Sequence, residues 1–337
     1  MAEFGKMKIF DADELIAEMG AQHLRAFAQS SEERFMRHTR HIAYRAAWDD
    51  DLRLILVSGP TSSGKTTFTK RLAAALNFYG RETTLLSMDD YYLENTAFFA
   101  DNGLPNYETM DTLDIKQMSR DIRRLLDGER VNLPLFDLKE RVRVMDPKHT
   151  LQLPKNGILL VEGLHALNPL LRQFLDRKEY YGIFIMPYAT LMTAQRALEP
   201  MDHRVLRRIS RDQSQRGAGA LATLDYWPVI KMEEERVFPS YLESADYFFN
   251  SIVPYEYFLV PGLAAKQLSA DLERYHAGEL KQSIFVQNGR DFPDNVLLAH
   301  EEETISHAEK LLQICEDLPL IDLDFVPEIS ILNEFIH

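Results

Sequence analysis

Short apolar runs alternate with amphipathic stretches along the middle of the chain. The five runs are RLILVSG at 53–59, ETTLLSM at 82–88, GILLVEG at 157–163, YGIFIMP at 181–187 and ADYFFNS at 245–251. Because they contain little polar alternation, they suit strands that are buried on both faces of a parallel sheet, with crossover helices between them. The pattern predicts an α/β fold with a parallel sheet of about five strands and helices on both faces.

The segments around these runs have helical periodicity. Residues 11–47 are predicted to be mainly helical, and the chain after residue 261 to form two or three helices. The interval between the second and third runs is too long for one crossover helix. It is predicted to hold a loop, a helix over 113–129 and a hairpin over 131–144.

Charge and cysteine content narrow the classes of function. The 337 residues include 38 Lys and Arg against 52 Asp and Glu, a formal charge of −14, which argues against nucleic acid as a partner. Cys315 is the single cysteine, so no intramolecular disulfide can form and a reducing compartment is expected. No run reaches the roughly 18 apolar residues of a membrane span. We therefore expect a cytoplasmic protein without a membrane partner. Assembly into a homo-oligomer is possible.

A phosphate-binding motif follows the first run directly. GPTSSGKT at 59–66 satisfies G-x-x-x-x-G-K-[ST] between a predicted strand and a predicted helix. The glycines let the backbone wrap phosphates, the lysine neutralises them and the last hydroxyl can ligate Mg²⁺. The candidate nucleotide-binding residues are Gly59, Thr61, Ser62, Ser63, Gly64, Lys65, Thr66 and Thr67. A switch GTPase is disfavoured because the chain has neither D-x-x-G nor N-K-x-D.

Two carboxylates stand where later runs end. Asp89 directly follows the second run, and Glu162 ends the third. Ligands gather at the carboxyl ends of parallel strands, so both should face the same crevice as the phosphate motif. Asp89 is the candidate base for an attacking hydroxyl, and it joins Glu162 and Thr66 as candidate Mg²⁺ residues. The alternative is that Asp89 and Asp90 cap a following helix.

Arginines cluster in HRVLRRISRDQSQRG, at helical spacing. The cluster comprises Arg204, Arg207, Arg208, Arg211 and Arg216. Guanidinium groups held together repel unless they meet anions, and they suit bidentate phosphate contacts. We predict a lid over 200–220 that closes on the transferring phosphoryl group. The alternative is a solvated face paired with Asp202 and Asp212.

Taken together, these motifs resemble the phosphoribulokinase and uridine kinase family of P-loop kinases. The similarity is greatest to its bacterial uridine kinase-like nucleoside kinase branch, and it spans about residues 32–336. The segments that carry it are SGPTSSGKTTF, LSMDDYY, LPLFDLKERVRV, EGLHALNP, RVLRRISRD, DYWPVI, ADYFFNS and VPEISILNEFI.

The resemblance implies a role for several residues. It makes Asp89 the catalytic base, with Lys65 and Arg211 assisting on the phosphates and Arg216 also contacting nucleotide. The implied acceptor-binding residues are Tyr92, Glu108, Phe136, Arg141 and Arg208. Phe136 and Arg141 depart from the Tyr and His usual in uridine kinases. Arg141 donates hydrogen bonds but cannot accept them, which favours an acidic or carbonyl-rich acceptor.

The motifs and the resemblance imply three regions and a function. Residues 1–50 are expected to form an N-terminal helical extension, 51–260 a P-loop kinase domain with an acceptor-binding insertion at 91–150, and 261–337 a C-terminal helical segment. The favoured function is ATP- and Mg²⁺-dependent phosphorylation of a nucleoside 5′-hydroxyl, of uridine or cytidine type. A kinase of a sugar, sugar phosphate or other hydroxyl acceptor is one alternative. The other is a nucleotide-binding regulatory protein with little turnover.

Overall fold

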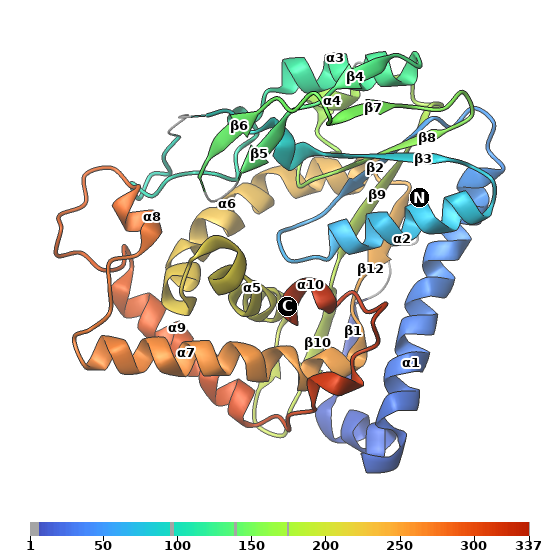
Figure 1. Ribbon diagram of the computed structural model, residues 1–337. Helices are drawn as coiled ribbons and strands as arrows, with labels where there is room; N and C mark the ends of the chain where they lie inside the picture. The colour runs from blue at the N-terminus through green and yellow to red at the C-terminus, as the bar shows by residue number, and fades with distance from the viewer. Residues whose placement is uncertain (1–6, 95–97, 138–139, 174, 337) are drawn as a thin grey trace.

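A parallel sheet of five strands, in the order β12-β9-β2-β8-β3, forms the centre of the computed structural model (Figure 1). The structure describes residues 7–94, 98–137, 140–173 and 175–336. Each of the five apolar runs forms one strand, which confirms the predicted α/β fold. The strands are β2 (Leu54–Ser58), β3 (Thr83–Ser87), β8 (Ile158–Glu162), β9 (Tyr180–Met186) and β12 (Tyr247–Asn250).

The sheet is buried on both faces, as its unalternating runs predict. In β2, Ile55 and Val57 pack into one hydrophobic cluster, and Leu54 and Leu56 pack into another on the opposite face. All four side chains are fully buried because helices cover both sides of the sheet. These helices are α1 (Ala12–Ala47) and α2 (Lys65–Phe78) on the first face, and α3 (Ile115–Leu126) and part of α6 (Ala220–Ser244) on the second.

The N-terminal region is helical from Ala12 onward. Asp11 caps α1 by accepting a hydrogen bond from the Glu14 amide at 3.0 Å, and the helix bends at Gly20, where φ is 37°. A second sheet that the sequence patterns did not predict lies beside it. Its strands are β1 (Lys8–Asp11), β10 (Ala189–Met192) and β11 (Ala197–Leu198).

The long interval between β3 and β8 contains the predicted helix and hairpin. It begins with the 3-10 helices η1 (Met88–Tyr91) and η2 (Met110–Thr112), followed by α3. Two antiparallel ribbons complete it, with β5 paired to β6 as the hairpin and β4 paired to β7. Their bounds are β4 (Arg130–Asn132), β5 (Leu135–Asp137), β6 (Val142–Val144) and β7 (Thr150–Gln152).

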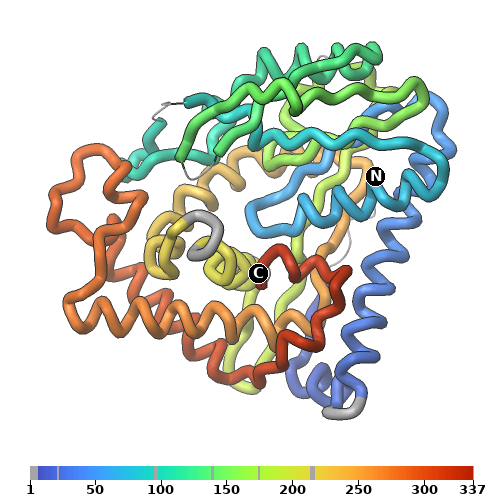
Figure 2. The backbone as a smooth tube through the Cα atoms, viewed as in Figure 1, coloured from blue at the N-terminus to red at the C-terminus, as the bar shows by residue number. Residues whose placement is uncertain are grey.

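Helices dominate the last third of the chain and share the hydrophobic cluster of the first sheet face. The chain finally returns to the start of α2, so that α10 lies beside the phosphate-binding loop (Figure 2). Cys315 is buried on α9, and no helix within the described residues is long and apolar enough to cross a membrane. The remaining elements are α4 (Pro169–Arg172), α5 (Pro200–Arg216), η3 (Pro254–Phe258), α7 (Val260–His276), α8 (Ile284–Gln287), α9 (Glu301–Glu316), η4 (Leu323–Phe325) and α10 (Asn333–Ile336).

Candidate active site

Side chains of residues outside the loop between β2 and α2, residues 59–64, donate hydrogen bonds to its carbonyl oxygens. Lys65 Nζ donates to Pro60 O at 2.9 Å, and Ser251 Oγ donates to Ser63 O at 2.7 Å. Arg204 and Arg207 donate to the intervening carbonyls, at 3.2 Å and 3.1 Å. A trans peptide points its C=O and N–H in opposite directions, so fixing these carbonyls also directs the amide groups that bind phosphate in such loops.

Two glycines of the loop are required by geometry. A Cβ on Gly59 would lie 2.0 Å from Ile185 O, so only glycine lets β2 run this close to β9. Gly64 has φ of 84°, in the left-handed region, and a Cβ there would lie 2.2 Å from Ile331 Cδ1. The first glycine therefore permits close strand packing, and the second permits the turn into α2.

Gly64→Ala is expected to lower the free energy of unfolding by at least about 1–2 kcal/mol, the usual cost of a left-handed conformation for a residue with a Cβ. The clash with Ile331 adds to that cost. Urea denaturation of Gly64→Ala, of Ile331→Ala and of the double variant separates the two effects. The double variant compared with Ile331→Ala shows the backbone strain alone, because the cavity left by the buried Ile331 side chain is present in both. Equal stability of Gly64→Ala and wild type would contradict this geometry.

Lys65, Thr66 and Glu162 meet at the carboxyl end of the sheet. Thr66 Oγ1 donates to Glu162 Oε1 at 3.0 Å. Burial lowers the pKa of Lys65, against the opposing influence of Glu162 and Asp89. Burial and the nearby charge of Asp89 raise the pKa of Glu162 to about 7. Asp89 is thus close enough to interact electrostatically with both groups.

The oxygen atoms of Thr66 and Glu162 suit Mg²⁺, which binds through one or two protein oxygens together with water and substrate phosphates. The crowding of Glu162 with Asp89 provides the negative charge that a divalent cation would neutralise. Within the described ranges, no group of three or more His, Cys, Asp or Glu side chains could hold a metal by itself. The residues therefore fit a cation that is bound jointly with nucleotide.

Asp89 and Asp90 differ in their surroundings. Both lie in η1, immediately after β3, where the Ser87 hydroxyl accepts a hydrogen bond from the Asp89 amide at 3.3 Å. The Asp89 side chain is exposed. Asp90 accepts a hydrogen bond from the Phe136 amide at 3.3 Å, which ties η1 to β5, and burial raises the pKa of its carboxyl. Asp89 is therefore the carboxylate available to a substrate.

The residues expected to bind the acceptor form two groups. Tyr92 and Phe136 lie with ring centroids 5.4 Å apart, next to η1. The guanidinium of Arg141 lies 3.9 Å from the ring centroid of Tyr107, which is a cation–π contact. Glu108 follows Tyr107 in the chain, and its Oε1 lies 3.6 Å from Arg208 NH1. Glu108 thus joins the insertion to α5.

The arginines of α5 are buried clamps on the loop rather than a solvated face. Arg204, Arg207 and Arg208 are at most 3% exposed, and Arg211 is 7% exposed. Arg208 donates to Thr61 Oγ1 at 3.1 Å and to Asp212 at 2.7 Å, while Arg211 donates to Ser62 Oγ at 3.4 Å. The side chain of Arg216 lies outside the described residues. The solvated face of the alternative prediction is wrong for the four described arginines, but its pairing with Asp212 is present, because Arg208 and Arg211 both contact that carboxylate.

Sequence reasoning missed the acidic partners of these arginines. Glu234 binds Arg204 and Glu256 binds Arg207, both as buried pairs. Neither carboxylate lies in a recognisable motif, so only the three-dimensional contact identifies it. Glu334, in the segment VPEISILNEFI, contacts both Thr67 and Arg211. The resemblance singled out that segment, but its residues suggested no chemistry.

Comparison with known proteins places this site within a recognised family. The sequence model of the Phosphoribulokinase / Uridine kinase family matches residues 54–254, the segment that contains the sheet and α5. A uridine kinase from Staphylococcus epidermidis is 28% identical over 191 residues, covering 56% of this chain and 82% of that protein.

Similarity also extends to one segment of a larger plant protein. Inorganic pyrophosphatase TTM1 from Arabidopsis thaliana is 33% identical over 150 residues, 44% of this chain, and the chain spans only 21% of its length. Among solved structures, one described as a possible uridine kinase from Bacillus stearothermophilus is 18% identical with a TM-score of 0.38. The match covers 59% of this chain and 88% of that one.

Proposed function

The chain belongs to the phosphoribulokinase/uridine kinase family of small-molecule kinases, and on this premise we propose that it transfers phosphate from ATP to the 5′-hydroxyl of a nucleoside. The observation that carries the proposal is the gathering of Glu162 and Asp89 around Lys65 and Thr66 of the phosphate-binding motif, with the aromatic pair of Tyr92 and Phe136 just after Asp89 in the fold. The likeness to a uridine kinase over most of that protein's length supports a nucleoside of uridine or cytidine type.

Each group has a role in phosphoryl transfer. Lys65 and Arg211 neutralise negative charge on the phosphates, and the amides of the loop bind their oxygens. Bound Mg²⁺, held by Thr66 and Glu162, would supply further neutralisation of the phosphate oxygens. Asp89 accepts the proton of the attacking hydroxyl, for which its exposed position beside Lys65 and Glu162 is suitable. Catalysis rests on positioning and charge, as is usual for this reaction.

Arg141 favours a second candidate, a kinase of a sugar, sugar phosphate or other non-nucleoside hydroxyl acceptor. Its guanidinium is held over the Tyr107 ring, one residue before Glu108, and so adds positive charge to the acceptor side. A third candidate is a nucleotide-binding regulatory protein with little turnover. The acceptor-side residues argue against it, because a protein that only binds nucleotide needs none of them.

Release of ADP from ATP and Mg²⁺ across a panel of nucleosides, sugars and sugar phosphates tests these candidates. The proposal expects a nucleoside to stimulate release strongly over the rate without acceptor. Stimulation by a sugar or sugar phosphate alone would favour the second candidate. Tight ATP binding with no stimulation by any acceptor would favour the regulatory protein.

Arg141→Ala is expected to raise the KM for the acceptor about tenfold, the usual size of a lost charge-assisted hydrogen bond, with the KM for ATP unchanged. Arg120→Ala is a matched control, since Arg120 is an exposed arginine of the same insertion whose Nε donates only locally, to Lys116 O. Steady-state kinetics with the stimulating acceptor checks this. Equal acceptor KM values for both variants would contradict a role for Arg141 in acceptor binding.

A further inference from the structure

The last described residues of the chain pack directly onto the phosphate-binding loop. Ile331, Leu332 and Phe335 are fully buried, and Ile331 covers Gly64. The Phe335 ring lies beneath two guanidinium groups, 4.9 Å from that of Arg207 and 5.9 Å from that of Arg211. The segment Pro327–Ile336, called here the C-terminal segment, is thus seated between the loop and α5 (Figure 1).

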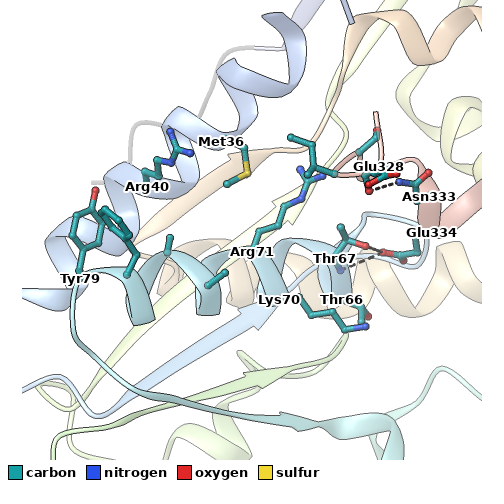
Figure 3. A pocket seen from close by; sticks show the side chains of 15 residues that line it. Met36, Arg40, Thr66, Thr67, Lys70, Arg71, Tyr79, Glu328, Asn333 and Glu334 are labelled. Carbon is teal, nitrogen blue, oxygen red and sulfur yellow. Dashed lines mark hydrogen bonds between the residues drawn. The ribbon is translucent and has the colours of Figure 1, made fainter. Parts of the chain in front are cut away.

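Glu334 extends from this segment to the first turn of α2. Its Oε2 accepts hydrogen bonds from Thr67 Oγ1 at 3.0 Å and from the Thr67 amide at 3.4 Å, as Figure 3 shows. Its Oε1 lies 3.4 Å from Arg211 NH1. Its charge also acts on Lys65 and on Glu162. A carboxylate therefore lies among the cationic and N–H groups of the phosphate site.

These donors are the ones that nucleotide phosphates require. The first amides of the helix after the loop bind phosphate because they have no partner within the helix and lie at its positive end. One carboxylate and the oxygens of a triphosphate cannot accept the same Thr67 donors, and their negative charges repel each other at this distance. Occupation by Glu334 and occupation by ATP therefore exclude each other.

We propose that the C-terminal segment is an intramolecular inhibitor of nucleotide binding, with Glu334 occupying contacts that ATP takes over. ATP binds when the Glu334 carboxylate leaves Thr67 and Arg211 and α10 shifts away from α2. This inference rests on the proposed use of the loop for ATP, but the identity of the acceptor does not enter it.

The surroundings of α10 allow such a shift. A cavity of about 1100 Å³ adjoins the C-terminal segment between α1 and α2, and Thr67, Lys70, Ile329 and Asn333 are among its lining residues (Figure 3). α10 has only four residues, so its own helical hydrogen bonds hold it weakly. The exposed ammonium of Lys70 offers the displaced carboxylate another cation in the same cavity.

Glu334→Gln tests the inference because glutamine keeps the size of the side chain and removes the charge that competes with phosphate. We expect the Kd for ATP, measured by calorimetry, to fall about 3- to 10-fold relative to wild type, since the competing occupant is weakened. Glu328→Gln is the matched control. Glu328 is an exposed acid of the same segment whose backbone carbonyl, not its carboxylate, accepts from Asn333 at 2.7 Å. Its Kd should match wild type within about twofold.

Hydrogen exchange of residues 327–336 in the wild-type protein gives a second readout that needs no variant. The inference expects these amides to exchange faster when ATP is bound than in the free protein. It is overturned if Glu334→Gln binds ATP no more tightly than wild type does, or if ATP slows exchange in the C-terminal segment. Neither readout involves an acceptor. If both readouts show competition between Glu334 and ATP but no nucleoside is phosphorylated, only the nucleoside kinase proposal is contradicted.

Discussion

Asp89→Asn is expected to lower kcat by about 10²- to 10⁴-fold, the usual contribution of a general base. Asparagine fills the same space as aspartate but cannot take the proton of the attacking hydroxyl. The Asp89 carboxylate is exposed beside Lys65 and Glu162 and makes no direct contact with the loop in the described hydrogen bonds and ion pairs. The affinity for ATP should therefore change little.

Two comparisons make this prediction specific. Asp90→Asn should reduce kcat far less, because an asparagine oxygen can still accept the hydrogen bond from the Phe136 amide. Calorimetric titration with ATP should give similar Kd values for wild type and Asp89→Asn. If kcat of Asp89→Asn stays within about threefold of wild type, another group removes the proton and the role given to Asp89 is wrong.

Glu256→Gln is expected to lower the free energy of unfolding by about 3–5 kcal/mol, the usual cost of breaking a fully buried ion pair from one side. Both Glu256 and Arg207 are completely buried, and they are joined by hydrogen bonds of 2.7 and 2.8 Å. Glutamine would leave the Arg207 guanidinium charged without a counter-charge. Because Arg207 also holds Ser62 O, the loop should lose order as well.

Urea denaturation at neutral pH measures this loss of stability. Glu235→Gln is the control, since it breaks the exposed pair with Lys231 and should cost under about 1 kcal/mol. Equal stability of Glu256→Gln and Glu235→Gln would contradict the buried pair.

The loss of stability in Glu256→Gln should also depend on pH. Burial alone would raise the pKa of Glu256, but the charges of Arg207 and His203 and the hydrogen bonds to the carboxylate together outweigh it, and the pKa lies below its ordinary value. The ionised carboxylate therefore stabilises the fold above the unfolded pKa of about 4.3, and this contribution disappears as pH falls through the lower folded pKa. The stability difference between wild type and Glu256→Gln should narrow in acid.

The strands and the phosphate loop were predictable because their signals are local. A strand buried on both faces must be a continuous apolar run, and all five runs became strands of one sheet. The loop needs glycines and a lysine at fixed spacing, so its sequence pattern carries its geometry. The meeting of Thr66 with Glu162 followed from the rule that carboxyl ends of parallel strands share one edge.

What could not be predicted depends on contacts between distant segments. The arginines of α5 were recognisable as anion-binding, but whether they meet phosphate, carbonyl groups or acids depends on how α5 packs. Arg204 and Arg207 bind both carbonyl groups of the loop and acids. The acids, Glu234 and Glu256, come from α6 and η3, which are separate from α5 in the sequence pattern. The small second sheet pairs Lys8 in β1 with Ala189 in β10, more than half of the chain away, and its short strands carry no distinctive pattern. Glu334 reaches Thr67 from 267 positions away.

Transfer of the labelled γ-phosphate of ATP to uridine or cytidine tests the central claim most directly. The account predicts that wild-type protein with Mg²⁺ forms labelled nucleoside 5′-monophosphate, identified by mass spectrometry, and that Asp89→Asn forms almost none while still binding ATP. If wild type binds ATP but transfers label to no nucleoside, the nucleoside kinase proposal is contradicted.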